Sequence, residues 1–423
     1  MIIENISALI GNTPLLKIPE AVHQIPNLDL YCKLEMMNAF GSIKDRIGLN
    51  LLNSNIADCK KNGKTVLEAS SGNTAKALAI LSSINGLNFK TVSNRIKSHE
   101  MKELLLLLNA EIEELPGFSE CPDPNNPDDY MNVAKSMSER NPDTYFYTDQ
   151  YFNEKNPEAH EKTAEEIIND LEKVDFFFSI LGTAGSSTGT GRVLKSKIKS
   201  KIIGVLTDRG SYVPGARTLD EMWEVGFFER NFYDEILAGS TNQAIEGMLT
   251  LIRKVGLLCG PTSGLSYQLL LDFFTKNPPK EKTTAVFVAC DRVELYLSYI
   301  EKHAPSLIGK HTLGIELLKV SNEEIDASKE ITATELKESI NDVMIIDVRS
   351  NEAYEMFHLP NSINLPTAEH EDFFGKNIPF AKNRKIVVAC SKGKTSKKLT
   401  AFLTKNGFDA ASLSGGVFSW NKV

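Results

Sequence analysis

The sequence predicts an α/β protein of two units, a large one with parallel sheets and a small one at the C-terminal end. Over residues 1–305, apolar runs of four to eight residues alternate with stretches of helical periodicity, which is typical of parallel sheets with helical crossovers. The pattern weakens over 306–330, which we predict to be a linker, and it resumes over 331–423. A chain of 423 residues is long enough for two or three hydrophobic cores.

Composition and charge narrow the class of function. The net charge is -8 and the basic residues are scattered, which argues against a nucleic-acid partner. No apolar run is long enough to span a membrane, and the N-terminal residues lack the basic and apolar regions of a signal peptide, so we expect a cytoplasmic protein. None of the six cysteines forms a CxxC pair, so the sequence predicts neither a metal site nor a disulfide framework.

The strands and helices of the large unit follow from these periodicities. The expected strands are Leu28–Lys33, Thr65–Ala69, Phe89–Val92, Glu111–Leu115, Tyr145–Tyr147, Phe176–Leu181, Ile202–Leu206 and Thr284–Ala289. The expected helices include Ala75–Ile84, His99–Leu108, Pro157–Leu171, Thr241–Val255 and Ser263–Thr275. The segment Pro116–Asp129 is rich in turn-forming residues and is predicted to be a loop.

A loop of glycine and small hydroxyl residues, Leu181–Arg192, follows an apolar run and precedes a helix that we expect to begin near Thr188. Such a loop brings backbone N–H groups and a helix dipole to one point, which favours a phosphate group. A tight strand–helix connection is the alternative interpretation. The loop is not a Walker motif, and no acidic residue follows at the distance that a dinucleotide site requires.

Lys44 follows a Gly-Ser turn and opens an apolar helix. The positive end of the helix dipole disfavours an ammonium group, so the pKa of Lys44 should fall. A lysine with a low pKa is suited to forming a Schiff base, although a lone lysine at such a place is more often an ordinary surface residue.

Six motifs in order connect these two segments to one family. They are Ile10–Leu15, the Lys44 segment, Ser70–Thr74, Gln150–Tyr151 with Asn156–His160, the Gly182 loop and Gly260–Gly264. With these motifs the first three hundred residues resemble the fold-type II, pyridoxal-phosphate-dependent cysteine synthase family, which includes cystathionine β-synthases. The resemblance implies a two-lobed fold like that of the tryptophan synthase β subunit, pyridoxal 5'-phosphate as cofactor and a homodimer.

The resemblance also implies roles for individual residues. Lys44 would bind the cofactor as a Schiff base and move protons, Asn73 would hydrogen-bond the ring hydroxyl, and Thr262 would face the ring nitrogen. The phosphate would lie on Gly182, Thr183, Ala184, Gly185 and Ser186, and the substrate carboxylate on Ser70, Ser71, Asn73, Thr74 and Gln150. Simple helix capping by Asn73, Thr74 and Thr262 is the alternative.

The reaction of such a family member is β-replacement on an activated serine, forming L-cysteine or a related amino acid. A neutral hydroxyl at Thr262 leaves the ring nitrogen largely unprotonated, which suits β-elimination. Ser70, Ala75 and Ala184 stand where the family usually has Thr, Gly and Gly, and they leave the amino-acid substrate open.

Arg217 bears on the leaving group of that substrate. The loop Val213–Arg217 resembles that of family members that use O-phosphoserine rather than O-acetylserine, and Arg217 would then bind the substrate phosphate through its guanidinium fork. A surface arginine in a turn is an equally good interpretation.

The second unit, residues 331–423, resembles a rhodanese domain. The matching pieces are Asp347–Arg349, His358–Pro366, the loop after Cys390 and Leu413–Trp420. Cys390 ends a strand and begins a loop that leads into a helix, where backbone N–H groups and Lys392 and Lys394 favour a thiolate and then a persulfide. Thr395 stands where the family often has Arg, and Phe357 where it has Gly, so the sulfur donor stays open; a structural cysteine is the alternative.

Together the units predict an enzyme whose rhodanese domain supplies sulfur as a Cys390 persulfide to the site at Lys44. Three alternatives remain open at this point. One is a 2,3-diaminopropionate synthase-like reaction with an amine nucleophile, another is a regulatory or scaffold protein with a docking rhodanese domain, and the third is a pair of independent domains in which free sulfide is the nucleophile.

Overall fold

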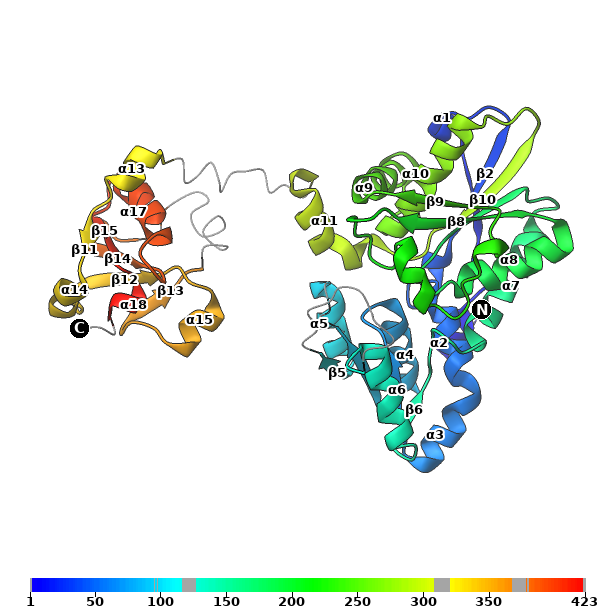
Figure 1. The fold of residues 1–423 in the computed structure, drawn as a ribbon, viewed down its shortest axis with the longest axis horizontal. Coiled ribbons are helices and arrows are strands. Elements are labelled where there is room, and N and C mark those ends of the chain that lie inside the picture. The colour runs from blue at the N-terminus through cyan, green and yellow to red at the C-terminus, as the bar shows by residue number, and fades with distance from the viewer. Residues whose placement is uncertain are drawn as a thin grey trace. The chain divides into compact units, whose positions relative to one another are not determined.

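The computed structural model of the chain describes residues 2–94, 96, 98–115, 127–307, 320–366, 378 and 380–420. These residues form two compact units, Met1–Ala304 and Pro305–Val423 (Figure 1). Within the predicted linker, residues 308–319 lie outside the described residues, as do 116–126 of the predicted loop. The linker range also contains helix α13 (Asn322–Asp326), which packs against α17 (Thr395–Lys405) of the second unit.

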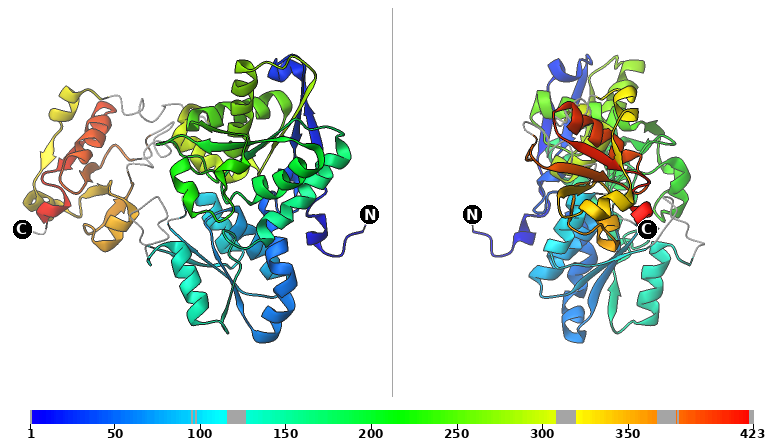
Figure 2. Two further views of the ribbon diagram at one scale, coloured as in Figure 1. Left: turned by 45° about the vertical axis from the view of Figure 1, so that its right-hand side comes forward. Right: turned by 90° about the vertical axis from the view of Figure 1, so that its left-hand side faces the viewer.

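The larger lobe of the first unit contains a six-stranded sheet in the order β1-β2-β10-β7-β8-β9. Its strands are β1 (Leu15–Ile18), β2 (Leu28–Lys33), β7 (Phe176–Ile180), β8 (Lys201–Thr207), β9 (Glu235–Gly239) and β10 (Thr283–Val288). Only β1 runs antiparallel to its neighbour. Two pairs of helices pack against this sheet: α7 (Lys155–Asp170) with α8 (Gly185–Ile198), and α9 (Thr241–Thr250) with α10 (Pro261–Lys276) (Figure 2).

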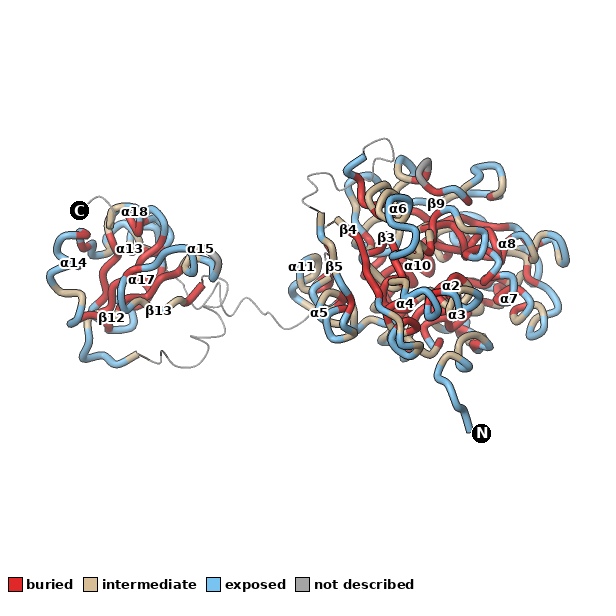
Figure 3. Tube along the Cα trace, turned by 90° about the horizontal axis from the view of Figure 1, so that it is seen from below, coloured by how far each residue is buried: buried red, intermediate tan, exposed pale blue. Residues whose placement is uncertain are grey.

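Adjacent residues of a strand separate the two cores of this lobe. Phe178 belongs to the core that contains Leu265 of α10, while Phe177 belongs to the core that contains Ile167 of α7 and Leu194 of α8. Because successive side chains of a strand point to opposite faces, a mostly apolar run such as β7 is buried on both sides. Figure 3 colours the chain by burial and shows buried segments in the interior of this unit.

The smaller lobe contains a parallel four-stranded sheet in the order β5-β4-β3-β6. Its strands are β3 (Thr65–Ala69), β4 (Phe89–Ser93), β5 (Glu111–Glu114) and β6 (Tyr145–Tyr147). Its cores include side chains of α4 (Asn73–Ile84) and α5 (His99–Leu107) on one face and of α6 (Tyr130–Arg140) on the other. The remaining helices of the unit are α1 (Glu20–His23), α2 (Lys44–Leu52), α3 (Ile56–Asn62) and α11 (Leu297–His303).

The second unit has a parallel five-stranded sheet in the order β11-β15-β14-β12-β13. Its strands are β11 (Glu330–Ile331), β12 (Val343–Asp347), β13 (Ser362–Asn364), β14 (Lys385–Ala389) and β15 (Ala410–Leu413). Besides α13 and α17 it contains α14 (Ala333–Ser339), α15 (Asn351–Met356) and α18 (Val417–Trp420). One core lies against α17 and the other against α14, so this sheet too is buried on both faces.

The predicted α/β class and the two-lobed first unit are confirmed, and all eight predicted strands of that unit are present. The prediction missed β1 and β9, which lie at the two edges of the larger sheet. It also placed four helix starts too late, because α4, α7, α8 and α10 begin at Asn73, Lys155, Gly185 and Pro261 rather than near Ala75, Pro157, Thr188 and Ser263. Among the described residues, no helix has both the length and the apolar composition needed to cross a membrane.

Candidate active site

Lys44 is the first residue of α2, as predicted, and the turn before it is fixed to the end of β10. The Ile43 N–H group donates to the Cys290 carbonyl at 2.7 Å, and the Lys44 N–H group donates to the Ser42 hydroxyl at 3.3 Å. Burial lowers the pKa of the Lys44 amine, while Cys290 and Asp291 partly oppose this shift. A neutral amine is the form that attacks a carbonyl carbon, so Lys44 is suited to its predicted role.

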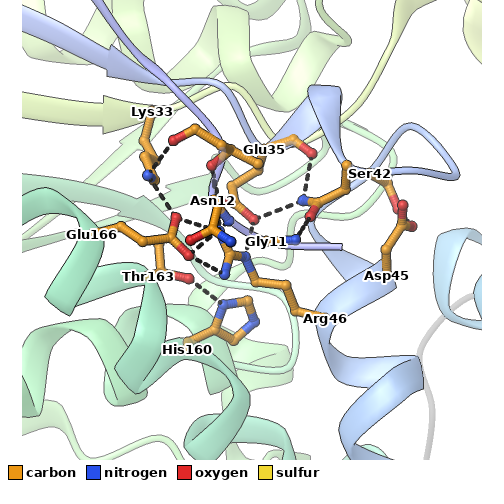
Figure 4. A network of polar contacts seen from close by, with 12 residues as sticks. Gly11, Asn12, Lys33, Glu35, Ser42, Asp45, Arg46, His160, Thr163 and Glu166 are labelled. Atoms are coloured by element: carbon orange, nitrogen blue, oxygen red, sulfur yellow. Dashed lines mark hydrogen bonds and ion pairs between the residues drawn. The ribbon is translucent and has the colours of Figure 1, made fainter. Parts of the chain in front are cut away.

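A buried ionic network behind Lys44 holds α2 in place (Figure 4). Arg46 donates two hydrogen bonds to Glu35, at 2.7 and 2.8 Å, and two to Glu166, at 2.8 and 2.7 Å. Lys33 Nζ lies 2.7 Å from the same Glu166 carboxylate. Although burial alone raises it, these two cations lower the pKa of Glu166 to about 2. The network joins β2, α2 and α7, so it fixes the position from which Lys44 projects.

Asn73 reaches across from the smaller lobe to the loop after β10. Its Nδ2 donates to Asp291 Oδ2 at 2.6 Å and to the Tyr296 hydroxyl at 3.4 Å, and Tyr296 also donates to Asp291. Burial raises the pKa of Asp291. The Asn73 Oδ1 and Asp291 Oδ1 atoms are buried, and neither has a hydrogen-bond partner among the described residues. Buried acceptors of this kind indicate a place for a bound donor.

The loop between β3 and α4 carries the predicted carboxylate-binding residues. The Ser70 hydroxyl accepts the N–H groups of Gly72 and Ala75 at 3.3 and 3.4 Å. Thr74 donates to Gln150 Oε1 at 2.7 Å, so the structure brings these two predicted residues together, while Ser71 is exposed. Because Gly72 occupies the N-cap position, Asn73 and Thr74 are not capping residues, and that alternative is wrong.

The glycine loop forms the start of α8. Ala184 is the N-cap residue and has a φ of 58°, in the left-handed region. Asn156 lies beneath the loop, where its Nδ2 donates to Thr183 Oγ1 at 3.1 Å; a Cβ at Gly185 would come within 2.0 Å of its Oδ1. The Ser186 hydroxyl is buried without a hydrogen-bond partner in the described parts of the chain. The loop therefore combines a helix start with an unpaired hydroxyl, as an anion site requires.

Thr262 is in the first turn of α10, after the N-cap residue Gly260, so it is not a capping residue either. Its hydroxyl is buried and has no hydrogen-bond partner within the described residues. Burial raises the pKa of the Cys290 thiol to about 12, and the nearby Thr262 hydroxyl partly opposes this rise. Cys290 is the second residue after β10 and is partly buried. The structure thus places Thr262, Cys290 and Lys44 in one neighbourhood.

Arg217 lies beside the glycine loop rather than on the open surface. Its backbone N–H group donates to the Leu181 carbonyl at 3.0 Å, and its side-chain Nη1 donates to the Glu221 carbonyl at 3.2 Å. The guanidinium lies 5.4 Å from the centre of the Tyr151 ring, next to Gln150 in the sequence. Arg217 is therefore close to both predicted binding loops, which weakens the surface-turn interpretation.

Several residues of this neighbourhood were not assigned from the sequence. Asn156 belongs to a motif that supported the resemblance, but a buried asparagine in a helical segment gave no signal of its own. Asp291 and Tyr296 lie after β10. Cys290 lies there too, but from the sequence it was grouped with the buried cysteines. Their position at the carboxyl end of a parallel strand was the signal that could have identified them.

Cys390 is the centre of a separate site in the second unit. Its sulfur accepts the N–H groups of Gly393 and Ser396 at 3.2 and 3.4 Å and lies 3.3 Å from the Ser396 hydroxyl. Burial alone raises the pKa of this thiol, but the Ser396 hydroxyl and the loop N–H groups lower it below its usual value. Lys392 contributes through its backbone N–H group, while its side chain is exposed.

Comparison with protein families divides the chain in the same way. Residues 6–291 match the family described as pyridoxal-phosphate dependent enzyme, and residues 332–423 match the rhodanese-like domain.

Relatives of known name include a cysteine synthase and a cystathionine beta-synthase. Cysteine synthase B of Salmonella typhimurium is 30% identical over 299 residues, which cover 68% of this chain and 93% of that protein. Cystathionine beta-synthase of Apis mellifera is 30% identical over 320 residues, which cover 70% of this chain and 61% of that protein. The chain therefore spans less than two thirds of the honeybee enzyme.

Solved structures support the same assignment. Cysteine synthase from Entamoeba histolytica has a TM-score of 0.63 at 28% identity, over 71% of this chain and 90% of that chain. The O-acetylserine dependent cystathionine beta-synthase from Helicobacter pylori has a TM-score of 0.60 at 28% identity, over 70% of this chain and 98% of that chain.

The unpaired groups of the first unit fit pyridoxal phosphate, the cofactor of this family. Ser186 and the start of α8 suit its phosphate, Asn73 Oδ1 suits a ring hydroxyl, and the buried Thr262 hydroxyl suits a ring nitrogen. The predicted cofactor and both predicted domain types agree with the matched families. The chain therefore belongs to the pyridoxal-phosphate-dependent enzyme family, as a cysteine synthase-like member with a C-terminal rhodanese-like domain.

Proposed function

We propose that this enzyme replaces the leaving group of O-acetylserine or O-phosphoserine with sulfur, forming L-cysteine or a related amino acid. The observation that carries the proposal is the set of unpaired buried groups on Asn73, Asp291 and Thr262, which lie in the same neighbourhood as the Lys44 amine. The names of the relatives, cysteine synthase and O-acetylserine dependent cystathionine beta-synthase, support a serine-derived substrate.

The bound cofactor supplies the electron sink for elimination at the β-carbon. In this proposal the Lys44 amine holds the cofactor and carries the α-proton of the substrate, and its lowered pKa keeps it able to accept that proton. Thr74 and Gln150, with the unpaired N–H groups at the start of α4, orient the substrate carboxylate.

We further propose that Cys390 supplies the sulfur. Its thiolate attacks the outer sulfur of thiosulfate, the S–S bond of the donor breaks, and sulfite leaves with the electron pair. The outer sulfur of the persulfide then forms a bond to the β-carbon of the substrate, from which acetate or phosphate has left. A dithiol reductant cleaves the remaining S–S bond to Cys390, which gives the product thiol and the Cys390 thiol, and the reductant itself becomes a disulfide. The lowered pKa of Cys390 supports the first step, since the thiolate is the nucleophile.

The direct test combines the purified chain with O-acetylserine or O-phosphoserine and with sulfide, or with thiosulfate and dithiothreitol, and measures L-cysteine. Lys44→Ala should abolish product with every pair. Borohydride reduction should trap the cofactor on the Lys44 peptide, while the peptide of Lys76, a buried lysine whose pKa is also lowered by burial, serves as an internal control. Turnover by Lys44→Ala, or cofactor trapped elsewhere, would contradict the proposal.

The alternatives have distinct outcomes in the same assay. Product with an amine nucleophile, and none with sulfur, would indicate a diaminopropionate synthase-like reaction. Bound cofactor whose absorbance does not change with either serine ester would indicate a regulatory or scaffold protein. We also propose a cytoplasmic homodimer, which light scattering of the purified protein and fractionation of the source cells would test.

A further inference from the structure

A chain of hydroxyl groups extends from Cys390 into the core of the second unit. The Ser396 hydroxyl lies 3.3 Å from the Cys390 sulfur and 2.8 Å from the hydroxyl of Ser412. Ser412 is a residue of β15 whose side chain is fully buried, and Ser396 is fully buried as well. We propose that Ser412 is a positioning residue that orients the Ser396 hydroxyl toward the Cys390 sulfur. This relay of two hydrogen bonds, from Ser412 to Ser396 and from Ser396 to Cys390, then stabilises the anionic form of the sulfur.

A count of hydrogens supports the direction of the relay. The two hydroxyl groups carry two hydrogens, and a thiolate accepts without donating. If Ser412 donates to Ser396 and Ser396 donates to the sulfur, each hydroxyl hydrogen has an acceptor. If the sulfur keeps its own proton, three hydrogens must be placed in two contacts, Cys390–Ser396 and Ser396–Ser412. One of the three hydrogens then has no acceptor among the hydrogen bonds that the described residues form. A buried hydroxyl without an acceptor is costly, so the arrangement fits the anion better.

The rest of the sulfur's surroundings is fixed by the backbone. The N–H groups of Gly393 and Ser396 are held by the loop and by the first turn of α17, so only the Ser396 hydroxyl can rotate away from the sulfur. Ser412 lies on β15, whereas Ser396 lies on α17, and the contact with Ser412 restrains the Ser396 hydroxyl, the one donor that can move. That contact explains why a hydroxyl residue is useful at a position where an apolar strand residue would otherwise complete the core.

A purely structural role is the competing interpretation. In that case the Ser396–Ser412 contact only ties α17 to β15, and its loss lowers the stability of the unit without changing the chemistry of Cys390. The two interpretations differ in one measurable quantity, the pKa of the Cys390 thiol.

The test uses the full-length protein and follows the alkylation of Cys390 by iodoacetamide against pH, with the modified peptide identified by mass spectrometry. Ser412→Val and Ser412→Thr have nearly the same shape and differ in the hydroxyl. Ser412→Val should raise the pKa of Cys390 by about 0.5 to 1 unit, while Ser412→Thr should keep it near the wild-type value. Thr400→Val is the matched control, because the buried Thr400 hydroxyl bonds to the Ser396 carbonyl at 3.0 Å and not to the sulfur.

Equal pKa values in the Val and Thr variants would overturn the proposal, as would an equal rise in Thr400→Val. If Ser412→Val does not fold, Ser412→Ala takes its place in the comparison with Ser412→Thr. The proposal builds on the function proposed for Cys390, but the thiol pKa is measured without any sulfur donor. A failure of sulfur transfer is therefore distinguishable from a failure of the relay.

Discussion

Two cysteines of the chain have opposite chemical surroundings. Burial raises the pKa of Cys290, beside Lys44, to about 12, so this thiol stays protonated at neutral pH. Hydrogen bonds from Ser396 and the loop N–H groups lower the pKa of Cys390 below its usual value. The surroundings therefore favour Cys390 over Cys290 as the predicted sulfur nucleophile, although Cys290 is the cysteine that belongs to the same unit as Lys44.

Arg217 provides a test of the leaving group at the scale of one side chain. We expect Arg217→Ala to lower kcat/KM for O-phosphoserine by roughly 10- to 100-fold, since a hydrogen bond between charged groups is lost, and to affect O-acetylserine much less. Steady-state kinetics with both esters measure the difference.

Arg209→Ala is the matched control for Arg217. Arg209 lies in the same segment, but it is exposed and pairs with Asp220. This variant should leave both substrates unaffected. Equal losses with the two esters in Arg217→Ala would remove the phosphate role and leave Arg217 as a residue that holds Tyr151 and the glycine loop.

At the scale of elements, the starts of α4, α8 and α10 carry the predicted binding residues in their first turns. A first turn leaves its N–H groups unpaired, so these groups remain available to an anion. The sequence prediction began each helix after its polar motif, because small polar residues are typical of loops. The structure includes those residues in the helix, so they are not its caps, and their predicted binding roles remain compatible with the fold.

Ala75 and Ala184 stand where the family usually has glycine. Replacing each with Gly should change the free energy of unfolding in opposite directions. Ala184 has a φ of 58°, whereas Ala75 is inside α4. Left-handed backbone costs a residue with a Cβ about 1 kcal/mol, and Gly in a helix costs a similar amount. Ala184→Gly should therefore raise the free energy of unfolding by up to about 1 kcal/mol, while Ala75→Gly should lower it by about 1 kcal/mol. Denaturant titration compares them, and the same sign for both would contradict the explanation.

The ionic network behind Lys44 should make stability depend on pH. Glu166 has its pKa lowered to about 2 in the folded protein, against 4.5 for the free side chain. Its contribution is therefore fully present above pH 4.5 and is lost as the pH falls through 2. Glu166→Gln should cost about 3 kcal/mol at neutral pH, and the difference from wild type should shrink toward pH 2.

Glu158→Gln is the control on the same helix. Its exposed pair with Lys155 should be worth less than about 1 kcal/mol at any pH. Urea titrations at several pH values measure all three proteins. A Glu166→Gln cost that stays constant between pH 7 and pH 3 and below would show that the carboxylate charge is not what stabilises the network.

At the scale of the whole molecule, the question is why the two units share a chain. A tether raises the local concentration of one site at the other to roughly millimolar if it can span the distance between them. We expect Cys390→Ser to lose cysteine formation from thiosulfate while keeping the activity with free sulfide. Wild-type activity of Cys390→Ser with thiosulfate would contradict the sulfur hand-over and favour independent domains.

The sequence by itself determined the features that depend on local order. Apolar runs predicted the inner strands, because a strand buried on both faces is apolar at most of its positions. The turn before Lys44 and the loop after Cys390 were recognisable because each motif is contiguous. The edge strands β1 and β9 escaped prediction, since each has a single buried residue and therefore no long apolar run.

Only the tertiary structure decided which distant residues meet. Asn73 and Asp291 are 218 positions apart, Arg46 and Glu166 are 120 apart, and Ser396 and Ser412 lie on different elements. Their pairing results from how sheets and helices pack, which no local pattern encodes. The same packing removes water from Lys44 and directs N–H groups at Cys390, so the pKa values on which the chemistry depends are properties of the folded chain.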